Sequence, residues 1–175
     1  MKTTAEWLAG IENDRALLED WLKKQYRGEV RASIKVAELA ETIEDPSLRT
    51  AVDRVADDEG RHAAWIRAIL KVEGVEVNPD QENADDRYWR HVMDGELSQD
   101  ELLAAGAHAE QMRLVRIEAI MNSGVLGQHI IAVFRRIYED EVHHARIFSQ
   151  ACTPEAYAKM SEKHQAGLAA LGLEI

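Results

Sequence analysis

Apolar residues recur at every third or fourth position along most of this chain, which is the spacing of one face of an α-helix. The pattern predicts a helical stretch over residues 4–43, in which Trp7, Leu8 and Ile11 form a short first piece. It predicts further helices over 46–72 and 98–121, and from the turn at 122–124 to about 151. A short amphipathic helix is expected over 85–93, and a last helix over 153–171.

Residues suited to helix N-termini precede most of these segments. Ser, Thr, Asp and Asn accept hydrogen bonds from the first free backbone N–H groups, and Pro fits the first helical position. The expected caps are Asn13 or Asp14, Asp45 before Pro46, Ser98 with Glu101 as a capping box, and Thr153 before Pro154.

Six ionisable residues interrupt the apolar faces. Glu29 and Glu110 lie in the middle of the first and third long stripes. The sequence Asp-Glu-x-x-His occurs twice, at Asp58–His62 and Asp140–His144, and Glu and His three apart share one helix face. Burying a carboxylate without a counter-charge costs several kcal/mol. A bound metal is the simplest compensation for doing so twice in the same way.

The two halves of the chain repeat. Glu29 and Glu110 are 81 residues apart, whereas Glu59 with Glu141 and His62 with His144 are each 82 apart. Short turns within each helix pair favour antiparallel hairpins, and the long crossover over roughly 75–97 allows the pairs to stack. We therefore predict an all-α fold with one domain over 1–175. It comprises an antiparallel four-helix bundle over about 13–151 and an extra C-terminal helix over about 153–171.

The six residues can hold two divalent ions with a net charge near zero. Glu59 and Glu141, near the two-fold axis, are expected to bridge the ions. Glu29 with His62, and Glu110 with His144, are expected to be terminal ligands. Oxygen and imidazole ligands suit two iron ions, with manganese as the alternative. The positions left open on the metals would admit dioxygen or peroxide.

This ligand set resembles that of the ferritin-like superfamily of carboxylate-bridged di-iron and di-manganese proteins. Asp58-Glu59-Gly60-Arg61-His62 also resembles the Asp-Glu-x-Arg-His motif of bacterial multicomponent monooxygenases, although the second copy has His143 where that motif has Arg. The resemblance implies that Asp58 accepts a hydrogen bond from His144, and Asp140 from His62. The alternative is that both aspartates are half-exposed surface charges.

The chain departs from individual members of the superfamily. Rubrerythrin-type peroxidases usually carry paired Cys-x-x-Cys motifs and a further Glu one turn after the third-helix ligand, where this chain has Arg113. Bacterioferritin has a haem-ligating Met where Gly60 stands. Two functions stay open: an oxidase or oxygenase that activates dioxygen or peroxide, and a ferroxidase or iron-storage subunit. Symmetric His ligation favours the enzyme.

Composition narrows the partners. The net charge of −11 argues against broad contact with nucleic acid or with an anionic membrane surface. The single Cys excludes an intrachain disulfide, and the first residues do not resemble a signal peptide, so a cytoplasmic location is expected. A small-molecule substrate or electron donor is expected, and a homodimer or larger homo-oligomer is compatible with the sequence. Tyr26 and Tyr138 are expected in the core, with a redox role as the alternative.

Overall fold

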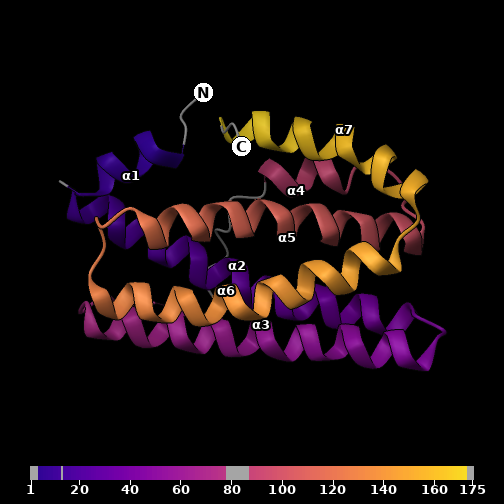
Figure 1. Ribbon diagram of the computed structural model, residues 1–175, viewed down its shortest axis with the longest axis horizontal. Helices are drawn as coiled ribbons and strands as arrows, with labels where there is room; N and C mark the ends of the chain where they lie inside the picture. The colour runs from indigo at the N-terminus through magenta and orange to yellow at the C-terminus, as the bar shows by residue number, and fades with distance from the viewer. Residues whose placement is uncertain (1–3, 13, 78–86, 173–175) are drawn as a thin grey trace.

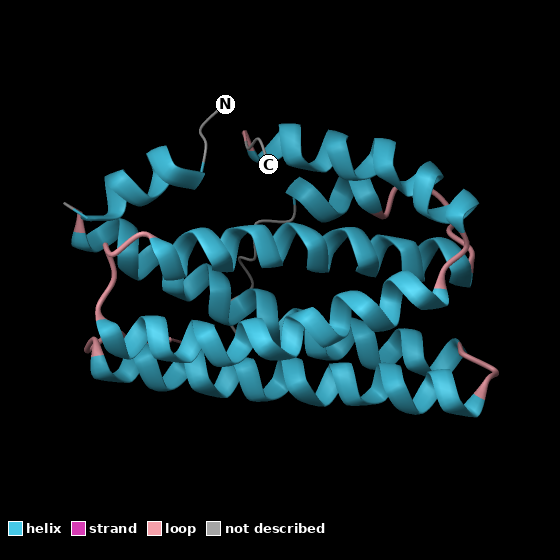
Figure 2. Cartoon of the chain, viewed as in Figure 1, coloured by secondary structure: helices cyan, strands magenta, loops and turns pink. Residues whose placement is uncertain are grey.

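The computed structural model describes residues 4–12, 14–77 and 87–172. This part of the chain forms helices and turns without strands, which confirms the all-α prediction (Figures 1 and 2). The helices are α1 (Thr4–Glu12), α2 (Arg15–Thr42), α3 (Pro46–Val72), α4 (Arg87–Val92), α5 (Gln99–Asn122), α6 (Gln128–Ala151) and α7 (Pro154–Leu171).

The helix starts follow the predicted caps. The side chain of Asp14 accepts from the backbone N–H groups of the first turn of α2, and Asp45 does the same for α3. Ser98 and Glu101 form the complete capping box of α5, and Thr153 caps α7. Asn13, the alternative cap, lies outside the described residues, as do residues 78–86 of the crossover.

Four long helices make the bundle. The turn between Thr42 and Pro46 folds α2 back on α3, and the link between Asn122 and Gln128 folds α5 back on α6. The two hairpins meet where α3 packs against α6. Helices α4 and α7 lie together along the outer side of α5, and α1 packs near the start of α2 (Figure 1). The antiparallel four-helix bundle and the extra C-terminal helix are thus confirmed.

The apolar core of the bundle is divided into two clusters. One contains Trp21, Leu70 and Phe134, and the Trp21 and Phe134 rings stack with centroids 5.1 Å apart. The other contains Ile43 and Phe148. The six ionisable residues lie between these clusters in the order of each helix, so they form a polar layer across the middle of the bundle. A third cluster joins α4, α5 and α7.

Among the described residues, every helix is either too short or too polar to cross a lipid bilayer.

Candidate metal centre

The polar layer brings together all six predicted ligand residues. Helix α2 supplies Glu29 and α5 supplies Glu110, while α3 and α6 each supply a Glu-x-x-His turn. The relative exposure of these residues runs from 0% to 7%, so they are buried. Because each occupies the inward face of a helix whose other inward residues are apolar, helix packing alone forces their side chains to converge.

Their ligand atoms form two overlapping groups. Glu29, Glu59, His62 and Glu141 place one ligand atom each within 4.8 Å of the others, and so do Glu59, Glu110, Glu141 and His144. Glu59 and Glu141 belong to both groups. We call the first group the Glu29 half and the second the Glu110 half of the centre. The overlap has the form expected if two ions share Glu59 and Glu141 as bridges.

Both histidines turn the same nitrogen inward. His62 Nδ1 lies 3.5 Å from Glu141 Oε1, and His144 Nδ1 lies 3.3 Å from Glu59 Oε1 and 3.4 Å from Glu141 Oε2. Neither Nδ1 has a well-aligned hydrogen bond within the described part of the chain. Buried polar atoms are normally paired. Unpaired imidazole nitrogens and carboxylate oxygens that converge suit iron or manganese, so the residues fit a metal pair.

The outward nitrogens meet the two aspartates. His62 Nε2 is 3.1 Å from Asp140 Oδ2, and His144 Nε2 is 3.2 Å from Asp58 Oδ2. Each bond crosses between α3 and α6, in the pairing that the resemblance implied. When the imidazole is neutral, an Nε2–H donated to a carboxylate leaves the free electron pair on Nδ1. The aspartates therefore orient both imidazoles toward the carboxylates.

Arg113 is a member of this site that the sequence analysis missed. Its Nη2 forms an ion pair with Glu29, and its Nε lies 2.6 Å from Glu141 Oε1. The interpretation of a metal as the simplest compensation for the buried carboxylates was therefore incomplete, because a guanidinium also supplies a counter-charge. The available signal was its position one turn after Glu110, beside the buried stripe of α5.

The carboxylates differ in pKa. Burial and the charge of Glu141 raise the pKa of Glu59, and the same causes raise that of Glu110 well above its ordinary value. Burial also raises the pKa of Glu141, but Arg113 and contacts with Glu110 and the histidines outweigh it and hold that pKa well below the usual range. Glu110 therefore holds its proton to higher pH than an ordinary glutamate does, whereas Glu141 loses its proton at lower pH.

The histidine pKa values move in one direction. Burial lowers the pKa of His144, but contacts with Glu141 and Glu59 outweigh burial and raise it to about 10. The pKa of His62 is raised by the same kind of balance, with Glu141 as the main opposing group. Without a bound cation, protons on these imidazoles and on Glu110, together with Arg113, compensate the carboxylates. A metal ion that binds here has to displace protons.

Three further residues that the sequence analysis considered, Tyr26, Tyr138 and His143, differ in how deeply they are buried. Tyr26 is 5% exposed and packs in the cluster with Trp21, whereas Tyr138 is half-buried. Both positions agree with a packing role, and the redox role of either tyrosine stays a prediction. His143 is exposed on the outer face of α6.

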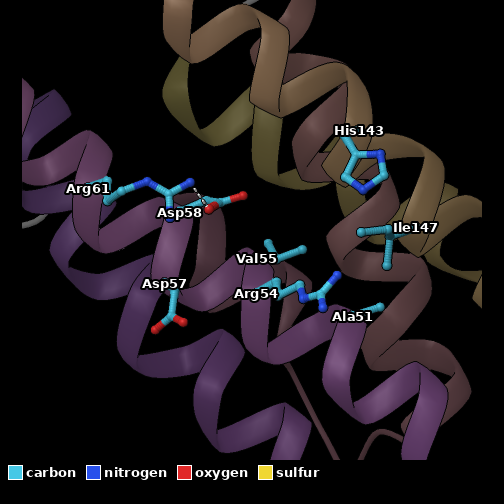
Figure 3. A pocket seen from close by; sticks show the side chains of 8 residues that line it. All are labelled: Ala51, Arg54, Val55, Asp57, Asp58, Arg61, His143 and Ile147. Atoms are coloured by element: carbon cyan, nitrogen blue, oxygen red, sulfur yellow. Dashed lines mark ion pairs between the residues drawn. The ribbon is translucent and has the colours of Figure 1, made fainter.

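A pocket of about 520 Å³ lies on the outer face of the α3–α6 pair. Figure 3 shows Asp58 paired with Arg61 at one end, and Arg54, His143 and Ile147 around the rest. Asp58 is also the partner of His144 Nε2. The pocket therefore reaches the carboxylate that orients one histidine of the centre.

The 82-residue repeat relates this pocket to a second position on the α3–α6 pair, beside His62, which is filled by side chains. Trp65 corresponds to Ile147 in the repeat, and Arg136 corresponds to Arg54. The guanidinium carbon of Arg136 sits 4.3 Å from the centre of the Trp65 ring, and that ring lies 5.5 Å from the ring of His62. Ile147 is smaller than Trp65 and leaves an open pocket at its position. The surroundings of the Asp58–His144 pair therefore differ from those of the Asp140–His62 pair.

No curated protein and no solved structure was found to match this chain. A comparison with protein-family models gave a match to the rubrerythrin model over residues 20–152. The match includes α3, α5 and α6 and all six converging residues of the polar layer. The chain belongs to the rubrerythrin family, whose domain is one of the ferritin-like di-iron superfamily.

Proposed function

We propose that this protein binds two iron ions, with manganese as the alternative, and uses them to activate dioxygen or peroxide as an oxidase or oxygenase. The observation that carries the proposal is the pair of overlapping ligand groups that share Glu59 and Glu141. Glu29 with His62, and Glu110 with His144, would complete the two coordination spheres. When bound, two adjacent iron ions would supply electrons jointly to one oxygen molecule.

The side chains of this chain then have separate tasks. Glu59 and Glu141 belong to both ligand groups, so each would contribute to holding both ions. Asp58 and Asp140 hold the imidazoles in one tautomer and orientation. The apolar clusters above and below keep bulk water out, which strengthens the electrostatic contacts of the layer.

Metal content after reconstitution with ferrous iron tests the proposal. We expect about two ions per chain, since six ligands and two bridging carboxylates suit an ion pair. Glu59→Ala should lose most of this iron because both halves use Glu59. Glu38→Ala is the matched control, since Glu38 lies on the same bundle but is exposed and pairs with Lys35. Fewer than one ion per wild-type chain, with iron in excess, would exclude the metal centre.

The storage alternative makes a different prediction for the same sample. A catalytic centre should take up iron to a fixed ratio and consume oxygen only while a reductant is supplied. A ferroxidase of a storage shell should continue to take up ferrous iron and deposit it as a growing mineral. Iron uptake measured against protein concentration therefore separates the two.

A further inference from the structure

The guanidinium of Arg113 contacts Glu29, which belongs to one half of the centre, and Glu141, which belongs to both. Its Nη2 pairs with Glu29 Oε1, and its Nε lies 2.6 Å from Glu141 Oε1. Glu141 Oε1 is also the oxygen that faces His62, whereas Oε2 of the same carboxylate faces His144. Arg113 thus occupies the side of Glu141 that belongs to the Glu29 half.

We propose that Arg113 is a built-in cation that competes with metal for the Glu29 half, so that the Glu110 half fills first and the Glu29 half second. This inference rests on the proposed metal centre. It assigns to Arg113 a positioning role, which sets the order and affinity of metal binding.

The two halves differ in what a metal must displace. Glu110 and His144, which belong to the Glu110 half alone, form no ion pair with an arginine or lysine in the described part of the chain. Arginine cannot lose its proton in a protein, so the charge of Arg113 stays wherever the guanidinium is. A divalent ion between Glu29 and Glu141 would lie within a few ångströms of that charge. In a weakly solvated layer such repulsion is large, so the ion binds only after the guanidinium moves away.

The side chain of Arg113 is closer to solvent than the carboxylates that it contacts. Arg113 is 20% exposed, whereas Glu29 and Glu141 are 0% exposed. Solvent therefore reaches part of the Arg113 side chain, although its Nε and Nη2 are buried against the two carboxylates. Rotation of the side chain outward would break its contacts with Glu29 and Glu141. The carboxylates that it leaves are those that the second ion would bind.

Cobalt(II) titration of the chelator-treated protein, followed by its visible absorption, tests the order. We expect two binding steps in the wild type, the second weaker by about tenfold or more, as repulsion by one uncompensated charge would give. Glu110→Ala should remove the tight step, and Glu29→Ala should remove the weak step and leave the tight one. The reverse assignment would overturn the inference.

Substitutions of Arg113 test the cause. Arg113→Met should tighten the second step by about tenfold or more, so that the steps merge. Arg113→Lys keeps a cation and should keep two steps. Arg135→Met is the matched control, because it removes one positive charge at an exposed position of α6. Should Arg113→Met fail to fold, Arg113→Gln, which is also neutral, replaces it in the same comparison.

The outcomes separate this inference from the proposed function. Two equal steps in the wild type, or an unchanged second step in both neutral variants, would refute competition by Arg113 and leave the metal centre standing. Binding of fewer than one ion per wild-type chain would refute both.

Discussion

Each histidine of the polar layer is in contact with an aspartate through Nε2 and with the buried carboxylates through Nδ1. Each Nε2 meets an aspartate on the opposite helix of the α3–α6 pair, and each Nδ1 faces the shared carboxylates. The aspartates are partly exposed, 17% for Asp58 and 32% for Asp140, so they link the buried layer to solvent. Their negative charge should matter to reactivity more than to metal retention.

Asp140→Asn tests this at the level of one residue. The amide can still accept a hydrogen bond from His62, but it lacks the charge that makes the imidazole a stronger ligand. We expect most of the iron to remain and oxygen consumption by the diferrous protein to slow by about 10-fold to 100-fold. Glu139→Gln removes a neighbouring exposed charge and should react at the wild-type rate. Equal rates for both variants would make Asp140 a surface charge.

The six converging residues could be predicted because their positions follow from helix spacing and from the repeat. The position of Arg113 one turn after Glu110 is visible in the sequence, but its inward contacts could not be predicted from that position, for a physical reason. A long basic side chain beside an apolar stripe commonly extends along that stripe to solvent. Whether its guanidinium turns inward depends on which carboxylates the opposing helices present, here Glu29 from α2 and Glu141 from α6.

At the scale of elements, the capped helix starts were predictable, whereas the start of α6 at Gln128, which has no side-chain cap, and the packing of α4 against α7 were not. Caps such as Asp45 and Ser98 act through their own first turns, so local sequence suffices to place them. The α4–α7 contact depends on where the crossover delivers α4. There the Tyr88 hydroxyl meets His164 Nδ1 at 2.7 Å, and the ring of Tyr88 lies against Gly167. Neither contact could be predicted from the spacing of apolar residues in the sequence.

Gly167→Ala should therefore loosen α7 from α4. A Cβ at this position would lie 2.6 Å from Tyr88 Cδ2 and 3.0 Å from the backbone oxygen of Tyr88, which cannot rotate away. Overpacking of this kind costs about 1–3 kcal/mol, against a gain of about 1 kcal/mol in helix propensity. We expect a net loss of about 1 kcal/mol in urea unfolding.

The control for this change is Gly28→Ala in α2, where a Cβ would meet nothing within 4 Å. That variant should gain about 0.5–1 kcal/mol from helix propensity alone. If Gly167→Ala were as stable as Gly28→Ala, α7 would have to move freely relative to α4, contrary to the packing described here.

At the scale of the whole molecule, the charges that four helices bring into the polar layer determine how stability depends on pH. Between about pH 7 and pH 9 an unfolded chain has ionised glutamates and neutral histidines. The folded metal-free layer keeps protons on Glu110, Glu59 and the two histidines to the extent that their pKa values are raised. The folded state thus binds more protons than the unfolded one, and its stability falls as pH rises.

Thermal melts of the chelator-treated protein from about pH 7 to pH 9 test this balance. Glu141, with its lowered pKa, is ionised in both states over this range, and His164, with a pKa lowered to about 4 by burial, His108 and Arg116, is neutral in both. Only the groups with raised pKa contribute, each by up to about 1.4 kcal/mol per pH unit. The melting temperature of the metal-free protein should therefore fall steadily as pH rises.

Metal replaces these protons, so the melting temperature of the metal-loaded protein should depend less strongly on pH. A metal-free melting temperature that stays level or rises with pH would mean that the folded layer holds no extra protons, contrary to the raised pKa values.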